Sequence, residues 1–369
     1  MKQGGKNKGD RSTLNGCRDE INRIDGEIIS LIQRRLEVAV EIGRLKRGLG
    51  MDIMDPGREQ EVLRRLSSKR QENLNPQAIR AIFSEIISAA RSVQQVPIIA
   101  YLGPEGTFTH QAAISLYGRS ASFRATESIE EVFEWVEKGM CQHGLVPIEN
   151  SYEGSVNNTL DLLYKYDLKI GAEIFLRIRH YLLSRADHLE KVERLYSHPM
   201  ALAQCLSWIK AHLAGIQIKE VASTALAAKM AAEEPEAASV GSRLSGLAYD
   251  LNILGENIED HPDNVTRFLV IGKTQSKPTG KDKTSLLFLL KHVPGALYRA
   301  VGALSERNIN ISRIESRPMK TRNWEYLFFV DLEGHEQDES LKEALRGMEG
   351  HCIFMKRLGS YPTGGSPWD

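Results

Sequence analysis

The sequence has few of the features that mark secreted, metal-binding or membrane-spanning proteins. Its only cysteines are Cys17, Cys141, Cys205 and Cys352, and they form no CxxC pair, so no zinc site, redox couple or disulfide framework is indicated. No run of eighteen apolar residues occurs, which argues against a transmembrane helix, and the first residues lack the apolar core of a secretory signal. We therefore expect a cytoplasmic protein without a membrane partner.

The sequence also lacks a net charge. The 48 lysines and arginines equal the 48 aspartates and glutamates in number, so no long-range field favours nucleic acid. Any recognition of a charged ligand must therefore be local. A chain of 369 residues exceeds what one compact core normally holds, which predicts two or three domains.

The first part of the chain has the pattern of an all-helical domain. Residues 1–13 are polar and contain glycine, and we expect them to form a disordered tail. Residues 14–96 contain many helix formers and only two prolines. This predicts a long helix at about 17–46 and two shorter helices that begin at Pro56 and Pro76.

Two further domains are expected. From 98 to 273, short apolar runs alternate with helical patterns, which predicts an α/β fold with parallel sheets. The length of this segment allows two lobes that face each other across a cleft. A polar linker follows at 274–283, and residues 284–362 then show the order βαββαβ, which is typical of a ferredoxin-like α+β domain.

One residue of the long helix does not fit its pattern. The positions at alternating steps of three and four are Ile21, Ile24, Ile28, Leu31, Arg35, Val38, Ile42 and Leu45. All are large and apolar except Arg35, and a buried guanidinium without an anionic partner is unstable. Either an acid of the same chain, such as Asp25 or Glu59, or a bound anion would supply that partner.

Further polar residues favour the bound anion. Lys46 lies eleven positions beyond Arg35, which places it nearly in line at about 100° per residue. The other members of the set are Arg18, Asp55, Arg58, Glu59 and Gln94. Such a set would suit a small polyanion. Because three helices give the long one little to bury against, we expect a second copy of the chain to cover its apolar stripe.

Residues 14–96 resemble the helical class of chorismate mutase in the patterns RDEINRIDGEIISLIQRRLEVAVEIGRLK, MDPGRE and FSEIISAARSVQ. Members of that class are intertwined dimers that rearrange chorismate to prephenate. The resemblance implies that Arg35 and the partner subunit's Arg18 hold the two carboxylates of the substrate. It also implies that Lys46 and Gln94 form hydrogen bonds to the ether oxygen.

The same resemblance implies that Asp55 and Glu59 meet the ring hydroxyl and that Arg58 supports the site. Ala90 stands where better-known members carry a serine, so one side-chain hydrogen bond is lost. The reaction is an intramolecular pericyclic shift that needs no nucleophile and no proton transfer. Arginine clamps would select the reactive diaxial conformer, and a cation would stabilise the charge that grows on the ether oxygen.

Three stretches of the α/β segment carry polar residues at strand ends. One is YLGPEGTFTH, which opens a helix where free N–H groups can receive an anion, and which lacks the GxGxxG pattern of a dinucleotide site. The second holds Glu149 and Asn150, although turn and cap chemistry would also explain them. The third is DNVTRFLVIG, in which strand alternation places Thr266 and Phe268 on one face and Arg267 on the other.

Residues 98–272 resemble prephenate dehydratase in the motifs GPEGTFTHQAA, PIENSYEGSVNNTLDLL, SHPMALAQC, STALAA and DNVTRF. That family has a two-lobed fold similar to periplasmic binding proteins, with the active site in the cleft. The resemblance implies that Thr266 assists departure of the ring hydroxyl and that Arg267 binds a carboxylate. The other residues implied at this site are Glu149, Asn150, Ser197, Gln204, Thr224 and Phe268.

A threonine hydroxyl is a weak acid, yet the chemistry makes it sufficient. Loss of carbon dioxide and water turns the cyclohexadiene into a benzene ring, and this aromatisation supplies most of the driving force. The enzyme therefore needs a well-placed donor more than a strong one. Neither reaction requires an electron sink beyond the ring, so no metal and no organic cofactor is implied.

The last segment resembles the ACT family of amino-acid-sensing domains. The stretches that carry the resemblance are Gly295, Ala296 and Leu297, and Glu315, Ser316, Arg317 and Pro318. Pro294 and Gly295 start a helix, so backbone groups there can hold the charged ends of an amino acid. The resemblance implies that phenylalanine binds between paired domains and inhibits the dehydratase as an allosteric effector. A simple dimerisation module is the alternative.

Together these observations predict a bifunctional enzyme of phenylalanine biosynthesis that converts chorismate to phenylpyruvate as a homodimer or homotetramer. Two alternatives stay open. In one, the α/β segment prefers arogenate to prephenate. In the other, the cleft and the sensor domain form a non-catalytic amino-acid-binding regulator.

Overall fold

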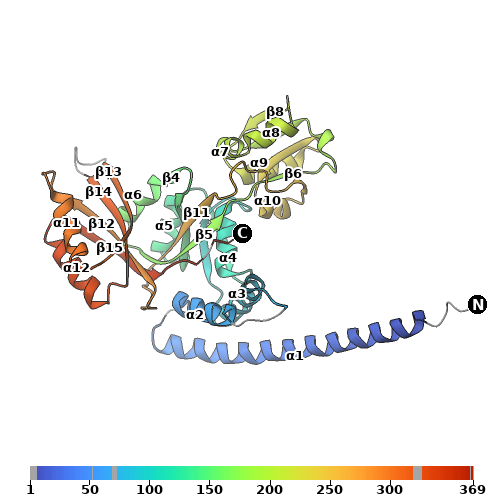
Figure 1. The fold of residues 1–369 in the computed structure, drawn as a ribbon, viewed down its shortest axis with the longest axis horizontal. Helices are drawn as coiled ribbons and strands as arrows, with labels where there is room; N and C mark the ends of the chain where they lie inside the picture. Colours follow the sequence, from blue (N-terminus) through green and yellow to red (C-terminus); the bar gives the residue numbers. More distant parts are fainter. Residues whose placement is uncertain (1–5, 52, 69–72, 319–325, 366, 369) are drawn as a thin grey trace, which may run out of the picture.

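The computed structural model describes the chain except for residues 1–5, 52, 69–72, 319–325, 366 and 369. Three helices come first, α1 (Lys6–Gly48), α2 (Pro56–Ser67) and α3 (Pro76–Ser92). Helix α1 runs along one edge of the molecule and extends well past the other two (Figure 1). No described helix combines the length and the apolar composition that crossing a membrane requires.

Local sequence explains where these helices begin. Asp55 caps α2 by accepting a hydrogen bond from the N–H of Arg58, and Asn75 caps α3 in the same way, each directly before a proline. Helix α1 begins at Lys6, inside the segment 1–13 for which the sequence predicted disorder. No proline interrupts α1, so the helix can propagate from its stronger central part toward Lys6.

The α/β segment is two-lobed, as predicted. The first lobe is built on a sheet of order β2-β1-β3-β11-β5, with the short β4 paired to β3. Its elements are β1 (Ile98–Leu102), α4 (Phe108–Tyr117), β2 (Ser122–Thr126), α5 (Ile129–Glu137), β3 (His143–Asn150), β4 (Gly154–Ser155), α6 (Asn157–Lys165), β5 (Lys169–Arg177) and, later in the chain, β11 (Val265–Gly272).

The second lobe lies between β5 and β11 in the chain and has a sheet of order β10-β6-β9-β7-β8. Its elements are β6 (Tyr181–Ser184), the short 3-10 helix η1 (Leu189–Lys191), β7 (Arg194–Ser197), α7 (Pro199–Gln204), α8 (Leu206–His212), β8 (Gln217–Glu220), α9 (Thr224–Glu233), β9 (Ala237–Gly241), α10 (Arg243–Ala248) and β10 (Asn252–Gly255).

Both sheets are mixed, whereas the sequence predicted parallel sheets. Strand β11 is antiparallel to β3 and β5, and β6 is antiparallel to β9 and β10. The reason is that the chain leaves the first lobe after β5 and returns to it in β11. The start of β11 therefore lies beside the ends of β3 and β5, where Thr266 pairs with Asn150 and Val265 pairs with Arg177.

The C-terminal segment has the predicted βαββαβ order, with the sheet arranged β13-β14-β12-β15. Its elements are β12 (Asp282–Leu290), α11 (Ala296–Ser305), β13 (Ile311–Pro318), β14 (Tyr326–Glu333), α12 (Glu339–Glu349) and β15 (Cys352–Pro362). Both helices pack on one face of the sheet around a core of their own. The other face packs on the first lobe.

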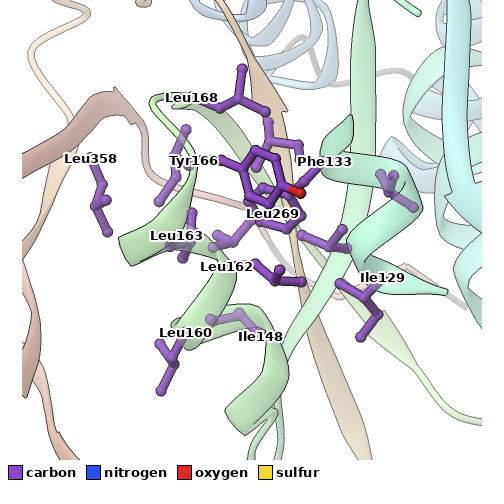
Figure 2. Close-up of a cluster of buried hydrophobic side chains, with 14 of the residues drawn as sticks. Ile129, Phe133, Ile148, Leu160, Leu162, Leu163, Tyr166, Leu168, Leu269 and Leu358 are labelled. Atoms are coloured by element: carbon purple, nitrogen blue, oxygen red, sulfur yellow. The ribbon is translucent and has the colours of Figure 1, made fainter. Parts of the chain in front are cut away.

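The first lobe and the C-terminal sheet share one apolar core. Leu358 of β15 and Phe329 of β14 belong to the same buried cluster as Ile148, Leu163 and Tyr166 of the α/β segment. Figure 2 shows Leu358 beside the side chains that α6 contributes to this cluster. Burying a large apolar side chain stabilises a fold by about 1.5–3 kcal/mol, so the contact joins the two parts firmly.

The helical segment docks through α2 and α3. Helix α3 packs on the turn that follows α4, where Glu85 accepts a hydrogen bond from the N–H of Arg119 and Ser88 accepts one from that of Ser120. At the start of α2, a side chain at Gly57 would lie 2.5 Å from Thr279 of the linker, so only glycine fits this contact.

Candidate active sites and effector site

Several predicted mutase residues gather where α1, α2 and α3 meet. The Arg35 guanidinium donates a hydrogen bond to the carbonyl of Ile86 at 3.2 Å, and the Lys46 ammonium donates one to the carbonyl of Ile53 at 2.8 Å. Neither cation forms an ion pair with an acid within the described residues. Burial lowers the pKa of Arg35, and the nearby Glu59 partly offsets that effect.

Glu59 is the acid at this junction. Its carboxylate lies 3.4 Å from the Nε atom of Arg91, and only a fifth of its side chain is exposed. Burial raises its pKa, and the charges of Arg91, Lys46 and Arg35 act in the opposite direction. Three cations, Arg35, Lys46 and Arg91, therefore stand against two acids, Glu59 and Asp55, and this excess of positive charge suits an anionic ligand.

The remaining predicted mutase residues make different kinds of contact. Gln94 packs directly on Gly43 of α1, and its side-chain amide donates a hydrogen bond to the backbone carbonyl of Ala90 at 2.9 Å. Its side-chain oxygen Oε1 is buried without a hydrogen-bond partner in the described chain. Asp55 is the cap of α2. Arg58 is turned toward solvent and pairs with Glu61.

Arg18 is exposed and lies toward the far end of α1. The apolar stripe that runs from it is also exposed, because the seven apolar residues between Ile21 and Leu45 are 41% to 67% exposed. The sequence predicted that this stripe is buried, and in a single chain it is not. The face of α1 that contacts α3 is instead formed by Ala39 and Gly43.

A cleft of about 730 Å³ lies between the two lobes of the α/β segment. Of the eight residues predicted at the dehydratase site, five line this cleft, namely Asn150, Gln204, Thr224, Thr266 and Phe268. The start of α4 also lines it, through Thr107 and Phe108. Within the described lining the cleft contains no lysine and no arginine.

Hydrogen bonds fix the direction in which Thr266 can donate. The carbonyl oxygen of the Asn150 side chain accepts hydrogen bonds from the N–H groups of Tyr152 and Glu153. Its amide nitrogen must therefore be the group that donates to Asn264 and to the Thr266 hydroxyl, each at 2.8 Å. Since the Thr266 oxygen accepts, its own proton is free to point into the cleft.

A second part of the network surrounds Gln204. Its carbonyl oxygen accepts a hydrogen bond from the Asn264 amide at 3.2 Å and lies 2.8 Å from Nε2 of His180. Its amide donates to Glu153 at 3.2 Å. His180 is thus the Nε2–H tautomer, and burial lowers its pKa, which keeps the ring neutral. Burial raises the pKa of Glu153.

Three residues predicted at the dehydratase site lie outside the cleft lining. Arg267 points away from it, as strand alternation predicted, but its guanidinium is occupied by protein groups. It donates to Glu173 at 2.7 Å, to Asp331 at 2.5 Å and to the Tyr361 hydroxyl at 3.0 Å, and Lys283 pairs with the same Glu173 at 2.9 Å. This buried cluster joins β5 and β11 to the C-terminal sheet, so a substrate carboxylate has no access to Arg267 here.

Glu149 and Ser197 are the other two. The Glu149 carboxylate lies 3.3 Å from Arg313 of β13 and so faces the C-terminal domain. The Ser197 hydroxyl is fully buried and donates to the carbonyl of Val240 at 2.9 Å, which ties β7 to β9. Both residues therefore stabilise strands near the cleft and do not line it themselves.

The two predicted effector stretches are separated within one chain. Gly295 has a φ of 76° and caps α11, and Ala296 and Leu297 line a hollow of about 150 Å³. Glu315 accepts a hydrogen bond from Ser155 at 2.8 Å, and Arg317 pairs with Asp161 at 2.8 Å. Glu315 and Arg317 thus face the α/β segment, whereas Ser316 and Pro318, which alternate with them in strand β13, are exposed on the other side.

Several polar residues of the cleft were not predicted from the sequence, among them Glu153, His180, His198 and Asn264. Asn264 stands inside the quoted motif DNVTRF, two positions before Thr266, so strand alternation places the two on the same side. No sequence pattern pointed to His180, because it lies between β5 and β6 in the connection that joins the two lobes.

Comparison with known proteins identifies each part. Family models match residues 17–95 (chorismate mutase type II), 99–276 (prephenate dehydratase) and 284–350 (ACT domain). A bifunctional chorismate mutase/prephenate dehydratase of Aquifex aeolicus is 46% identical over 95% of this chain and 98% of its own, and one of Pseudomonas aeruginosa is 36% identical over 96% and 98%. The crystal structure of prephenate dehydratase from Arthrobacter aurescens in complex with L-Phe matches with a TM-score of 0.68 and 34% identity, over 72% of this chain and 90% of the other.

Proposed function

Because this chain belongs to the family of bifunctional chorismate mutase/prephenate dehydratases with an ACT domain, we propose how its own residues carry out and regulate the two reactions. The enzyme rearranges chorismate to prephenate and then decarboxylates and dehydrates prephenate to phenylpyruvate. The names of its relatives do not favour the arogenate or the non-catalytic alternative.

In the mutase site, Arg35 and the partner subunit's Arg18 hold the two carboxylates of chorismate in the diaxial conformer. Lys46 and Gln94 stabilise the negative charge that develops on the ether oxygen. The support for this proposal is that, within the described residues, Arg35 and Lys46 donate hydrogen bonds to backbone carbonyls alone, which a doubly charged ligand can replace.

Asp55 and Glu59 complete the mutase site at the ring hydroxyl of chorismate. Arg58 supports it after turning inward from its exposed partner Glu61. The exposed apolar stripe of α1 supports the proposal that the enzyme is at least a homodimer, because a second copy would cover the stripe and bring Arg18 to Arg35. Pairing of the ACT domains would extend the dimer to a tetramer.

In the dehydratase cleft, Thr266 donates its proton to the leaving hydroxyl while the ring carboxylate departs as carbon dioxide. The electron pair of the breaking carbon–carbon bond enters the ring, which becomes aromatic, and one proton is consumed. The observation that carries this proposal is the hydrogen bond from Asn150 to the Thr266 oxygen. Because the Thr266 oxygen accepts this bond, its own proton is available for donation to the substrate.

Binding of prephenate needs groups other than Arg267. The cleft offers Asn150, Gln204 and Thr224 together with the first turns of α4 and α9, where free N–H groups favour carboxylates. Arg267 then contributes by holding β11, and therefore Thr266, against the C-terminal sheet.

Phenylalanine is the proposed effector, bound at the start of α11 and at β13 of a paired ACT domain. The hollow lined by Ala296 and Leu297 supports this proposal through its apolar lining and its position beside a helix start. Contacts from β13 to Ser155 and Asp161 give bound effector a route to the cleft.

A spectroscopic experiment tests the two activities together. The enzyme is incubated with chorismate, and phenylpyruvate is followed by its absorbance in alkali. No consumption of chorismate would refute the mutase proposal, whereas accumulation of prephenate would refute only the dehydratase.

Two variants test the residue roles. Arg35→Ala should abolish mutase activity and leave dehydration of added prephenate unchanged, because the two sites lie in different domains. Thr266→Ala should do the reverse and slow dehydration by about two to four orders of magnitude. Dehydration near the wild-type rate would show that Thr266 is not the donor.

A further inference from the structure

Arg91 of α3 lies between the mutase site and the dehydratase segment, and neither reaction as described above uses it directly. Its side chain is 5% exposed. The Nη2 atom donates hydrogen bonds to the carbonyls of Leu116 and Tyr117, at 3.2 and 3.1 Å, at the C-terminal end of α4. The guanidinium carbon lies 5.3 Å from the centre of the Tyr117 ring.

The other side of the guanidinium faces Glu59. Nε lies 3.4 Å from the carboxylate, and both Nε and Nη1 are buried without a hydrogen-bond partner among the described residues. A distance of 3.4 Å is long for a charged hydrogen bond, and hydrogen bonds in unoccupied active sites commonly shorten when the substrate arrives. Arg91 therefore has donors in place to fix the carboxylate.

The charges around Glu59 come from three elements. Arg35 and Lys46 belong to α1, Asp55 precedes α2, and Arg91 belongs to α3. Among them Arg91 has the largest effect in lowering the pKa that burial raises. In the proposed mutase site Arg35 and Lys46 turn to the substrate, which leaves Arg91 as the cation dedicated to Glu59.

We infer that Arg91 is a positioning residue for the mutase reaction, holding the Glu59 carboxylate toward the ring hydroxyl from an anchor on the backbone of the dehydratase segment. This inference rests on the proposed role of Glu59. Arg91 would then connect the mutase site physically to the dehydratase segment. The mutase site is complete only when α4 of the dehydratase supplies the carbonyls that hold the guanidinium.

Variants of the full-length enzyme test the inference. Arg91→Met keeps the apolar stem and removes the charge, and it should lower kcat/KM for chorismate by about tenfold to hundredfold, the range for losing one hydrogen bond to a charged group. Arg91→Lys retains a cation and should recover part of that loss. Dehydration of added prephenate should change by less than about threefold in both variants.

The matched control is Glu85→Ala. Glu85 also lies on α3 and accepts a hydrogen bond from the N–H of Arg119 in the turn after α4, and alanine removes that contact. If Arg91 served only to hold the two segments together, this control would impair the mutase as Arg91→Met does. If Arg91 positions Glu59, Glu85→Ala changes both activities by less than about threefold.

A double-mutant cycle separates positioning from a general structural effect. Arg91→Met introduced into Glu59→Gln should cost much less mutase activity than it costs in the wild type, because its effect passes through Glu59. In Arg91→Met the acid limb of the mutase pH profile should also move to higher pH. Loss of the cation raises the pKa of Glu59, so the ionised acceptor exists only at higher pH.

Additive losses in the cycle, or an unchanged acid limb, would overturn the inference. The proposed function has its own criterion, because Glu59→Gln alone must impair the mutase. If Glu59→Gln impairs it and neither Arg91 variant does, the proposed function stands and the positioning role of Arg91 falls. If Glu59→Gln has no effect, the role of Glu59 itself is refuted.

Discussion

The hydroxyl of Thr266 has one proton, and the hydrogen bond that its oxygen accepts restricts where that proton can point. The donor of this bond is Asn150, whose amide is oriented by two backbone N–H groups. In the proposed reaction, this small network would allow a weakly acidic side chain to act as the proton donor. The orientation requires no reorganisation free energy during the reaction, because it is already present in the folded protein.

The substitution Asn150→Asp tests this orientation. A carboxylate accepts where the amide donates, so it would draw the Thr266 proton toward itself and away from the substrate. Dehydration should slow by about a hundredfold or more and by more than in Asn150→Ala, which leaves the hydroxyl free to rotate. Steady-state rates with prephenate measure the effect, and equal rates in the two variants would contradict it.

Arg267 gives a prediction about stability rather than binding. Arg267 and Lys283 balance Glu173 and Asp331 in a buried cluster, so Arg267→Met leaves a negative charge without compensation. This should cost about 3–5 kcal/mol, seen as a lower midpoint of denaturant unfolding. The double variant Arg267→Met with Asp331→Asn restores the balance and should recover part of the loss.

If Arg267 bound substrate instead, Arg267→Met would raise KM for prephenate at unchanged stability. The contrast shows what sequence can and cannot predict at this scale. Strand alternation correctly separated Thr266 and Phe268 from Arg267. It could not find the partners of Arg267, because Glu173 and Asp331 lie 94 and 64 positions away along the chain and only the fold brings them together.

At the scale of elements, the unusual feature is the exposed apolar stripe of α1. The helix has 43 residues, or about 64 Å at 1.5 Å per residue, and much of it extends past α2 and α3 (Figure 1). A helix of this kind gains its stability from packing more than from its own propensity. A second copy of the chain would supply that packing.

Ile28→Glu should therefore dissociate the proposed dimer and abolish mutase activity together. A carboxylate in an apolar interface is expensive to bury, and loss of the partner also removes Arg18 from the site. Molar mass from light scattering and turnover of chorismate provide the two measurements. The control is Ser30→Glu, which places the same charge on the opposite side of α1 and should change neither.

Elements differ in how far local sequence determines them. The starts of α2 and α3 follow from Asp55 and Asn75, each next to a proline, and the βαββαβ order of the last segment follows from short-range patterns. Strand direction in the two lobes does not, because it depends on where the chain crosses between them. A pattern of strands and helices is the same whether β11 enters its sheet parallel or antiparallel.

At the scale of the whole molecule, the proposed sharing of the mutase site between subunits predicts complementation. Arg18→Ala and Arg35→Ala should each be inactive as mutases when expressed alone. Co-expressed at equal levels, they should recover about a quarter of the wild-type activity, because half the dimers are mixed and each mixed dimer has one intact site. Activity per enzyme molecule, with dehydratase activity as the internal reference, measures this, and no recovery would show that each site is built from one chain.

The shared core of the first lobe and the C-terminal sheet has a consequence for regulation. Leu358 and Phe329 lie in one cluster with Leu163 and Tyr166, so a swing of the ACT domain on its linker would open an apolar interior to water. The proposed feedback by an amino acid would then proceed without a hinge between the ACT domain and the first lobe. The second lobe has separate cores and takes no part in this cluster, so its movement against the first lobe is the motion that would open or close the cleft.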